Sequence, residues 1–154
     1  MKLSVIVPVY NEKENLPLLV DAVKQSLNGQ PHPWELILVD DGSKDGSPQV
    51  IETLAMEDPV HIRLIALRRN FGQTAAIAAG IDHADGDIII PMDADMQNDP
   101  ADIPMMVDKI NEGYDLVSGW RKQREDNFIT RTLPSRMANG LISWVTGVHL
   151  HDYG

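Results

Sequence analysis

The 154-residue sequence contains no cysteine. This excludes disulfide bonds and thiolate metal sites, and it fits a reducing compartment such as the cytoplasm. No run of apolar residues reaches the roughly 18–20 that cross a bilayer. Positive charge is also scarce: 13 Lys and Arg stand against 23 Asp and Glu, which gives a formal net charge of −10 at pH 7. Nucleic-acid binding is therefore not expected, because it needs a basic face that displaces counterions.

The basic side chains that are present lie partly in one short segment. Residues 121–136 contain five Lys or Arg and two Asp or Glu, on a chain that is otherwise strongly acidic. A basic segment on an acidic protein favours a local anionic partner. The overall composition, with 43% hydrophobic and 23% charged residues, is typical of a soluble globular domain with one core.

Five near-continuous apolar runs predict strands that are covered on both faces, as in a parallel sheet. They are Leu3–Val9, Glu35–Val39, Ile62–Leu67, Asp87–Met92 and Asp115–Gly119. Helical patterns alternate with these runs, so the sequence predicts an α/β fold with a Rossmann-like, mostly parallel sheet and helices on both faces.

Five helices are predicted from 3.6-residue spacing and from start signals. The first runs from Leu16 to Leu27 behind Asn15 as N-cap, and the second follows Ser47 as cap with Pro48 in its first turn. A helix of small residues spans 73–84 and is expected to pack closely on the sheet. A fourth helix covers 103–110, and a longer one runs from Phe128 to Val145, either as a core helix or resting on an anionic membrane surface.

The loops after the strands are the first place to look for a site, because ligands of such sheets bind beyond the carboxyl ends of the strands. Each loop has more polar residues than a turn needs. The loops read PVYNE (8–12), DDGSKDGS (40–47), RRNFGQ (68–73), DADMQNDP (93–100) and WRKQR (120–124).

Two carboxylates in the fourth loop favour a divalent cation. Asp93 and Asp95 are two residues apart, so in an extended chain their side chains lie on one face. Neighbouring carboxylates repel one another unless a cation is near. With the amide of Gln97 they offer oxygen ligands, which suit Mg²⁺ or Mn²⁺ and a shell completed by substrate phosphates. We expect a metal-bridged nucleotide diphosphate; the alternative is a solvated acidic turn in which Asp99 caps the next helix.

The first two loops offer groups for a nucleoside. Tyr10 is placed to stack on a base, and Glu12 shares its face by strand alternation. At most one of Asp40 and Asp41 is expected to face a ligand, where it would accept hydrogen bonds from a base or a ribose. The alternative for both loops is an ordinary strand-to-helix turn.

Arg121, Arg131 and Ser135 form a third set. Arg131 and Ser135 are one helical turn apart, and Arg121 follows the last predicted strand. Converging on one point, they would bind a phosphate; separately, each would be a solvated surface side chain.

The chain as a whole resembles a known family. The segments SVIVPVYNEKENLPLLV, ILVDDGSKDGS, LRRNFGQTAAIAAGIDHADGDIIIPMDADMQNDP and YDLVSGWR are similar to those of family 2 glycosyltransferases of the GT-A fold. The resemblance is strongest to the branch that uses polyprenyl phosphates, which includes dolichol-phosphate mannose synthases and bacterial undecaprenyl-phosphate sugar transferases.

The resemblance implies a role for each matching residue. The nucleotide-sugar site would comprise Pro8, Tyr10, Glu12, Val39, Asp41, Asp93, Ala94 and Asp95. Asp95 and Gln97 would bind Mg²⁺ or Mn²⁺, and Arg121, Arg131 and Ser135 would hold the acceptor phosphate. Asp93, Asp95 and Arg121 would be the catalytic residues. The segment LHDYG at 150–154 resembles the start of the acceptor side.

The implied activity is metal-dependent, inverting transfer of a sugar from a UDP- or GDP-linked donor to a polyprenyl phosphate, at the cytoplasmic face of a membrane in the full-length protein. The chain departs from the family at Met96, where Leu is usual, in QNDP, and above all in length, since relatives continue past DYG. We therefore expect residues 1–154 to be a single GT-A catalytic domain that is truncated on its acceptor side.

Three other functions compete with this one. A nucleotide-binding piece without catalysis fits the short length, and a family 2 enzyme with a non-lipid acceptor shares the donor motifs. A phosphoacceptor receiver domain also has paired acids at strand ends. It is disfavoured because it needs a lysine after the last strand, where this sequence has SGWR.

Overall fold

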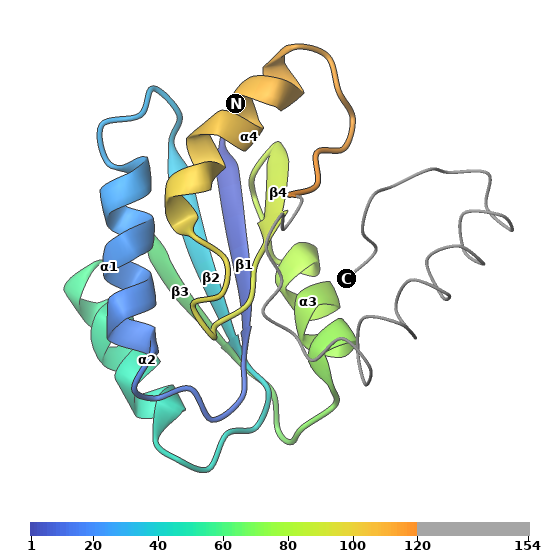
Figure 1. Cartoon of the computed structure of the whole chain (residues 1–154). Helices are drawn as coiled ribbons and strands as arrows, with labels where there is room; N and C mark the ends of the chain where they lie inside the picture. Colours follow the sequence, from blue (N-terminus) through green and yellow to red (C-terminus); the bar gives the residue numbers. More distant parts are fainter. Residues whose placement is uncertain (120–154) are drawn as a thin grey trace, which may run out of the picture. The chain divides into compact units, whose positions relative to one another are not determined.

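Four parallel strands form the sheet of residues 1–108, the first of two units into which the chain divides; the second begins at Lys109. The structure is a computed structural model that describes residues 1–119. The strands are β1 (Leu3–Val9), β2 (Trp34–Asp40), β3 (Ile62–Ala66) and β4 (Ile88–Pro91), in the order β3-β2-β1-β4. Because every pair is parallel, all four carboxyl ends lie at one edge, the lower edge in Figure 1.

Helices cover both faces of this sheet. One face is covered by α1 (Leu16–Leu27), α2 (Ser47–Glu57) and the start of α4 (Ile103–Asn111), and the other by α3 (Gln73–Asp82) (Figure 1). A short 3₁₀ helix, η1 (Pro100–Asp102), leads into α4. The predicted α/β architecture is confirmed. None of the helices within residues 1–119 is long and apolar enough to cross a membrane.

Strand alternation divides the core into two clusters. In β2, Leu36 and Leu38 pack with the buried residues of α1 and α2, whereas Ile37 and Val39 pack with those of α3. The predicted close approach of α3 is also present: a Cβ added at Gly80 would lie 2.3 Å from Cγ2 of Ile6 in β1. Only glycine lets this helix lie so close to the sheet.

The starts of α1 and α2 differ from the prediction. Asn15 is at the N-cap of α1, but its side chain makes no cap hydrogen bond; it donates to Glu12 Oε2 at 2.7 Å instead. Ser47 is not the cap of α2 but its first residue, behind Gly46. The first N–H of the helix is instead bound by Asp45. The Oδ1 of Asp45 accepts from the backbone N–H and from the hydroxyl of Ser47, at 2.9 and 2.6 Å.

The fifth predicted strand is wrong within the described residues, which form no strand over 115–119. Only Leu116 and Val117 are aliphatic in this segment, and the Asp, Ser and Gly around them disfavour a strand. The helix predicted from Phe128 to Val145 lies outside the described residues.

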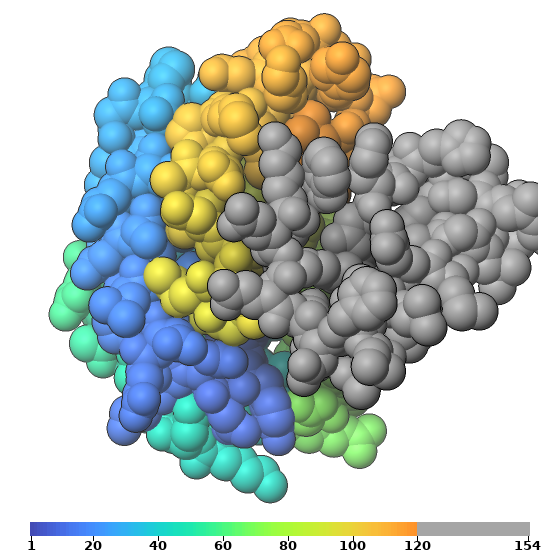
Figure 2. All heavy atoms as spheres, viewed as in Figure 1, coloured from blue at the N-terminus to red at the C-terminus, as the bar shows by residue number. Residues whose placement is uncertain are grey.

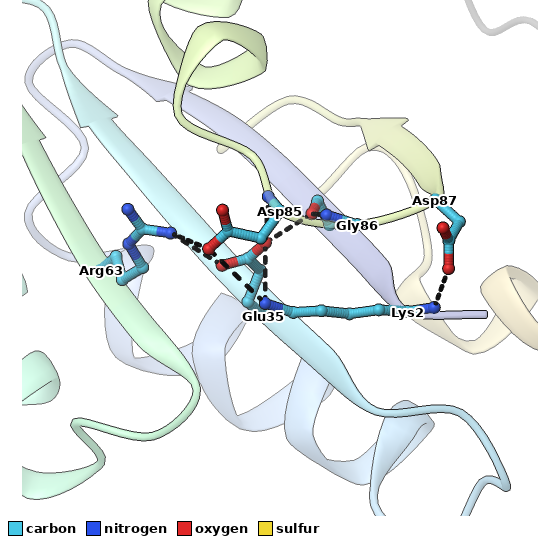
Figure 3. Close-up of polar contacts among 7 residues, drawn as sticks. Lys2, Glu35, Arg63, Asp85, Gly86 and Asp87 are labelled. Carbon is cyan, nitrogen blue, oxygen red and sulfur yellow. Dashed lines mark hydrogen bonds and ion pairs between the residues drawn. The ribbon is translucent and has the colours of Figure 1, made fainter.

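A buried carboxylate joins three strands at the edge opposite the predicted site (Figure 3). Glu35 in β2 is 2% exposed and accepts from Ser4 Oγ at 2.7 Å and from the Asp85 N–H at 2.8 Å. Both of these donate to Oε1, and Lys2 Nζ lies 3.3 Å from the same oxygen. Arg63 of β3 donates to the other oxygen, Oε2, at 3.0 Å. These contacts fasten the loop between α3 and β4 to the rest of the sheet.

The same loop is held by Gly86, whose N–H donates to Ser4 Oγ at 2.9 Å. A Cβ at Gly86 would lie 2.4 Å from that oxygen, so the loop can approach β1 only with glycine there. This loop fixes the start of β4. It therefore also helps to fix the position of Asp93, which follows the other end of the strand.

Candidate functional site

A cleft of about 390 Å³ opens at the carboxyl edge of the sheet. The loops after all four strands line it, with Pro8, Val9, Tyr10, Glu12, Asp41, Asn70, Gly72, Gln73, Asp93, Ala94 and Asp95. Figure 2 shows the segment after β4 (yellow) lying against the loop after β1 (blue). The structure thus brings seven of the predicted nucleotide-sugar residues into one cleft, although they come from three separate loops.

Other predicted residues lie elsewhere. The side chain of Val39 is fully buried under α3, so it can reach a ligand only through its backbone. Gln97 is exposed and is not among the residues that line the cleft. Arg121, Arg131 and Ser135 lie outside the described residues.

The loop after β1 turns sharply at Asn11, which has a left-handed φ of 57°. Its N–H donates to Ser43 Oγ and its Oδ1 accepts from the Lys44 N–H, both at 2.9 Å. Tyr10 and Glu12 both line the cleft as predicted, but a turn at Asn11 brings them there rather than strand alternation. Tyr10 is 46% exposed, so much of its side chain remains accessible to a ligand.

The two aspartates after β2 have different surroundings. Asp40 Oδ2 accepts from the N–H groups of Gly42 and Ser43 and so closes the turn after β2. Asp41 lines the cleft but is 3% exposed. Its Oδ1 accepts from the Phe71 N–H at 2.7 Å and its Oδ2 from the Gly72 N–H at 2.9 Å.

Gly42 in this turn has a φ of 73°, and a Cβ there would lie 2.5 Å from the Arg69 carbonyl carbon. The glycine of the DDGS segment is therefore needed for the close approach of the loops after β2 and β3. The two loops form one wall of the cleft.

The two aspartates after β4 are each held by a neighbour. Asp93 Oδ1 accepts from Gln73 Nε2 at 2.6 Å, and Asp95 Oδ1 accepts from the Gln97 N–H at 3.0 Å. Between Asp95 and Gln97, Met96 has a left-handed φ of 61°. Within residues 1–119, Asn11 and Met96 are the two residues other than glycine with positive φ. Strained backbone of this kind clusters at functional sites.

Asp99 caps the helical turn that follows it, as the alternative interpretation of this loop predicted. Its Oδ1 accepts from the Ala101 N–H at 2.9 Å and caps η1. The predicted capping alternative for Asp99 is therefore present, and the predicted metal site of the loop comprises Asp93, Asp95 and Gln97.

This donor set fits a divalent cation that shares its shell with a substrate. Within residues 1–119, no group of three or more His, Cys, Asp or Glu side chains is arranged to enclose a metal ion. Two carboxylates and one amide on an exposed loop instead suit Mg²⁺ or Mn²⁺, which keeps waters and takes further oxygens from phosphates. The site fits a metal only together with an anionic ligand.

Sequence reasoning missed the part of the cleft that follows β3. Asn70, Gly72 and Gln73 line it, beside Phe71, whose ring lies 4.8 Å from the guanidinium carbon of Arg69. The place of this segment in the chain could have indicated these residues, because the segment RRNFGQ follows a strand at the carboxyl edge and leads into a helix. The segment has no carboxylate pair, and so no residue in it was assigned a role.

Comparisons with known proteins identify the family of the chain. Residues 4–152 match the family described as Glycosyl transferase family 2. The chain is 48% identical over its whole length to a dodecaprenyl-phosphate galacturonate synthase of Rhizobium johnstonii, of which it covers 46%. It is 45% identical, over 99% of its length, to an undecaprenyl-phosphate 4-deoxy-4-formamido-L-arabinose transferase of Proteus mirabilis, of which it covers 47%. The chain thus spans about half the length of these curated relatives.

Solved structures share the fold. A mannosyltransferase of Pyrobaculum calidifontis in complex with GDP-Man and Mn²⁺ is 30% identical, with a TM-score of 0.54 over 60% of this chain and 27% of that one. S. aureus TarS 1–349 in complex with UDP-GlcNAc is 22% identical, with a TM-score of 0.63 over 85% of this chain and 38% of that one. The predicted GT-A-like α/β fold is confirmed by this likeness.

Proposed function

The chain belongs to glycosyl transferase family 2. From this premise we propose that its cleft binds a nucleotide-diphosphate sugar and that the sugar is transferred to a polyprenyl phosphate. The observation that carries the proposal is the convergence of Tyr10, Asp41, Asp93 and Asp95 on one cleft at the carboxyl edge of a parallel sheet. The names of the relatives, which are polyprenyl-phosphate synthases and transferases, support the lipid acceptor.

The donor would lie across the cleft with its base over the loops after β1 and β2. Tyr10 stacks on the base, and Glu12 and Asp41 accept hydrogen bonds from base or ribose. Asp41 can do so while it holds the Phe71 and Gly72 N–H groups, because each carboxylate oxygen has a second lone pair. Asp93 accepts from hydroxyls of the ribose or the sugar.

The metal end of the site would be formed by Asp95, which lines the cleft beside Ala94, and by Gln97 of the same loop. A bound Mg²⁺ or Mn²⁺ would supply positive charge that stabilises the departing diphosphate. Asp95 Oδ1 accepts from the Gln97 N–H at 3.0 Å, so this carboxylate is already partly oriented before a ligand binds.

The acceptor is proposed to attack in line. A phosphate oxygen of the lipid forms a bond to the anomeric carbon while the bond from that carbon to the diphosphate oxygen breaks. The diphosphate leaves with the electron pair, and the configuration inverts. The acceptor phosphate is already ionised near pH 7, so no strong general base is needed. Arg121, Arg131 and Ser135 would orient it, and orientation supplies much of the rate.

We place this reaction in a catalytic domain that includes residues 1–154, at the cytoplasmic face of a membrane, where a polyprenyl phosphate would be reached. Transfer of labelled sugar to polyprenyl phosphate distinguishes the proposal from its alternatives. Nucleotide binding without transfer indicates a binding module, and transfer only to a water-soluble acceptor indicates a different branch of the family.

The substitution Asp95→Ala tests the metal end of the site. It removes the carboxylate proposed to bind the metal and should abolish the part of UDP or GDP binding that depends on Mn²⁺, as measured by calorimetry with and without EDTA. Asp21→Ala, at an exposed position on α1 that does not line the cleft, is the matched control and should bind as the wild type does. Undiminished, metal-dependent binding by Asp95→Ala would refute this metal assignment.

A further inference from the structure

The loop after β3 reaches across the cleft to the first aspartate of the loop after β4. Gln73 is the first residue of α3, and its Nε2 donates to Asp93 Oδ1 at 2.6 Å. Both side chains line the cleft. The donor is an uncharged amide and the acceptor a carboxylate, which makes this a charge-assisted hydrogen bond.

We propose that Gln73 is a positioning residue: its amide holds one oxygen of Asp93, so that the second oxygen is oriented to accept from the ribose or sugar hydroxyls of the donor. This role rests on the proposed function of the cleft. In this proposal, the loop after β3 contributes to the site by orienting Asp93, a role that its sequence alone did not indicate.

The physical need for such a residue follows from the geometry of aspartate. The terminal torsion of a carboxylate is broad and roughly two-fold, so an exposed Asp has no fixed direction for its oxygens. A hydrogen bond to one oxygen restricts that torsion before the ligand arrives. The ligand then loses less binding free energy to ordering the side chain.

Gln73 can hold Asp93 because its own backbone is fixed. The residue before it, Gly72, has a φ of 94°, and its N–H donates to Asp41 Oδ2 at 2.9 Å. Phe71 donates from its N–H to Asp41 Oδ1 at 2.7 Å. Asp41 is almost completely buried, so its carboxylate is a firm anchor at the end of β2. Contacts therefore run from Asp41 through the loop to Gln73 and on to Asp93.

A purely structural role for Gln73, as a polar residue in the first turn of α3, predicts something different. Any unbranched side chain of similar length and helix propensity would then serve equally well. The two roles are separated by two variants: Gln73→Met keeps the length and removes the donor, whereas Gln73→Lys keeps an N–H donor. Gln25→Met, at an exposed position on α1, is the control.

The experiment is a calorimetric titration of UDP and GDP into the 154-residue protein and these variants in saturating Mn²⁺, with thermal unfolding recorded for each. Gln73→Met should bind the nucleotide that the wild type prefers several-fold, up to about tenfold, more weakly, the size expected when the Asp93 side chain has to be ordered on binding. Gln73→Lys and Gln25→Met should bind no more than about twofold more weakly than the wild type. All variants should unfold at similar temperatures.

A second readout tests the contact without any nucleotide. The side-chain amide resonances of Gln73 should shift when Asp93 is replaced by Ala, and those of Gln25 should not. Equal nucleotide affinity in wild type and Gln73→Met, equal losses in Gln73→Met and Gln73→Lys, or an unmoved Gln73 amide would each overturn the role of Gln73 and leave the proposed function intact. No nucleotide binding by the folded wild type would instead overturn the proposed function, and this role with it.

Discussion

Asn11 and Met96 hold a backbone conformation that residues with a Cβ rarely adopt, and both stand in loops that line the cleft. Asn is among the residues that tolerate this region best, and its side chain here also accepts a hydrogen bond from the Lys44 N–H. The turn at Asn11 thus joins the loops after β1 and β2 and brings Tyr10 and Glu12 to the same side. The PVYNE segment depends on its Asn for shape as much as on its Tyr and Glu for contacts.

Replacement of Asn11 separates these two contributions. Asn11→Gly keeps the left-handed turn and loses one hydrogen bond, whereas Asn11→Ala loses the hydrogen bond and is strained as well. We expect Asn11→Ala to be less stable than Asn11→Gly by roughly 1 kcal/mol, since the left-handed conformation costs an L-residue about 1–2 kcal/mol and the flexibility of Gly offsets part of it. Urea unfolding measures the difference, and equal stabilities would show that the turn is not constrained at this position.

Among the elements, β4 depends on contacts at both of its ends. Its first end follows the loop held by Glu35 and Gly86 (Figure 3). Its last end leads to Asp93 and Asp95, which line the cleft. Burial alone would raise the pKa of Glu35, but hydrogen bonds from Ser4, the Asp85 N–H, Arg63 and Lys2 outweigh it and lower the pKa from 4.5 to about 2. The charged form of Glu35 therefore stabilises the folded sheet.

This lowered pKa predicts how stability depends on acid. Because the folded pKa lies below the unfolded one, the contribution of Glu35 is complete above about pH 4.5 and is lost as the pH falls towards 2. The shift corresponds to about 3 kcal/mol at neutral pH. Glu35→Gln should thus be much less stable than the wild type at pH 7, and the gap in unfolding free energy should narrow between pH 4.5 and 2.

The exposed control Glu57→Gln, at the end of α2, should unfold as the wild type does at every pH. A gap between wild type and Glu35→Gln that stays constant with pH would mean that the charge of Glu35 does not contribute, and that only its shape does.

For the whole molecule, the alternation of parallel strands with helices was the most predictable feature. The four strands of the sheet were predicted to within one residue at either end, because a strand covered on both faces has to be apolar along its length. The parallel arrangement then placed the strand-end loops at one edge, and the cleft follows from that. The prediction of a strand at 115–119 was wrong, because this segment has only two aliphatic residues to bury.

The connections between loops could not be predicted in the same way. Gln73 lies 20 residues from Asp93 and Asp41 lies 30 residues from Phe71 in sequence. Such hydrogen bonds depend on loop conformations, on the left-handed φ at Asn11, Gly72 and Met96, and on close approaches that only glycine allows. Sequence patterns predicted seven of the residues that line the cleft, and the folded structure was needed to show which contacts hold them in place.

The most direct test of a metal-dependent donor site is a calorimetric titration of UDP and of GDP into the wild-type protein, first with Mn²⁺ and then with EDTA. We predict that one of the two nucleotides binds in Mn²⁺ and that EDTA removes most of this binding, which would also identify the base of the donor. If the folded protein binds neither nucleotide, or binds one equally well in EDTA, then Asp95 and Gln97 do not form the metal and diphosphate site proposed for this cleft.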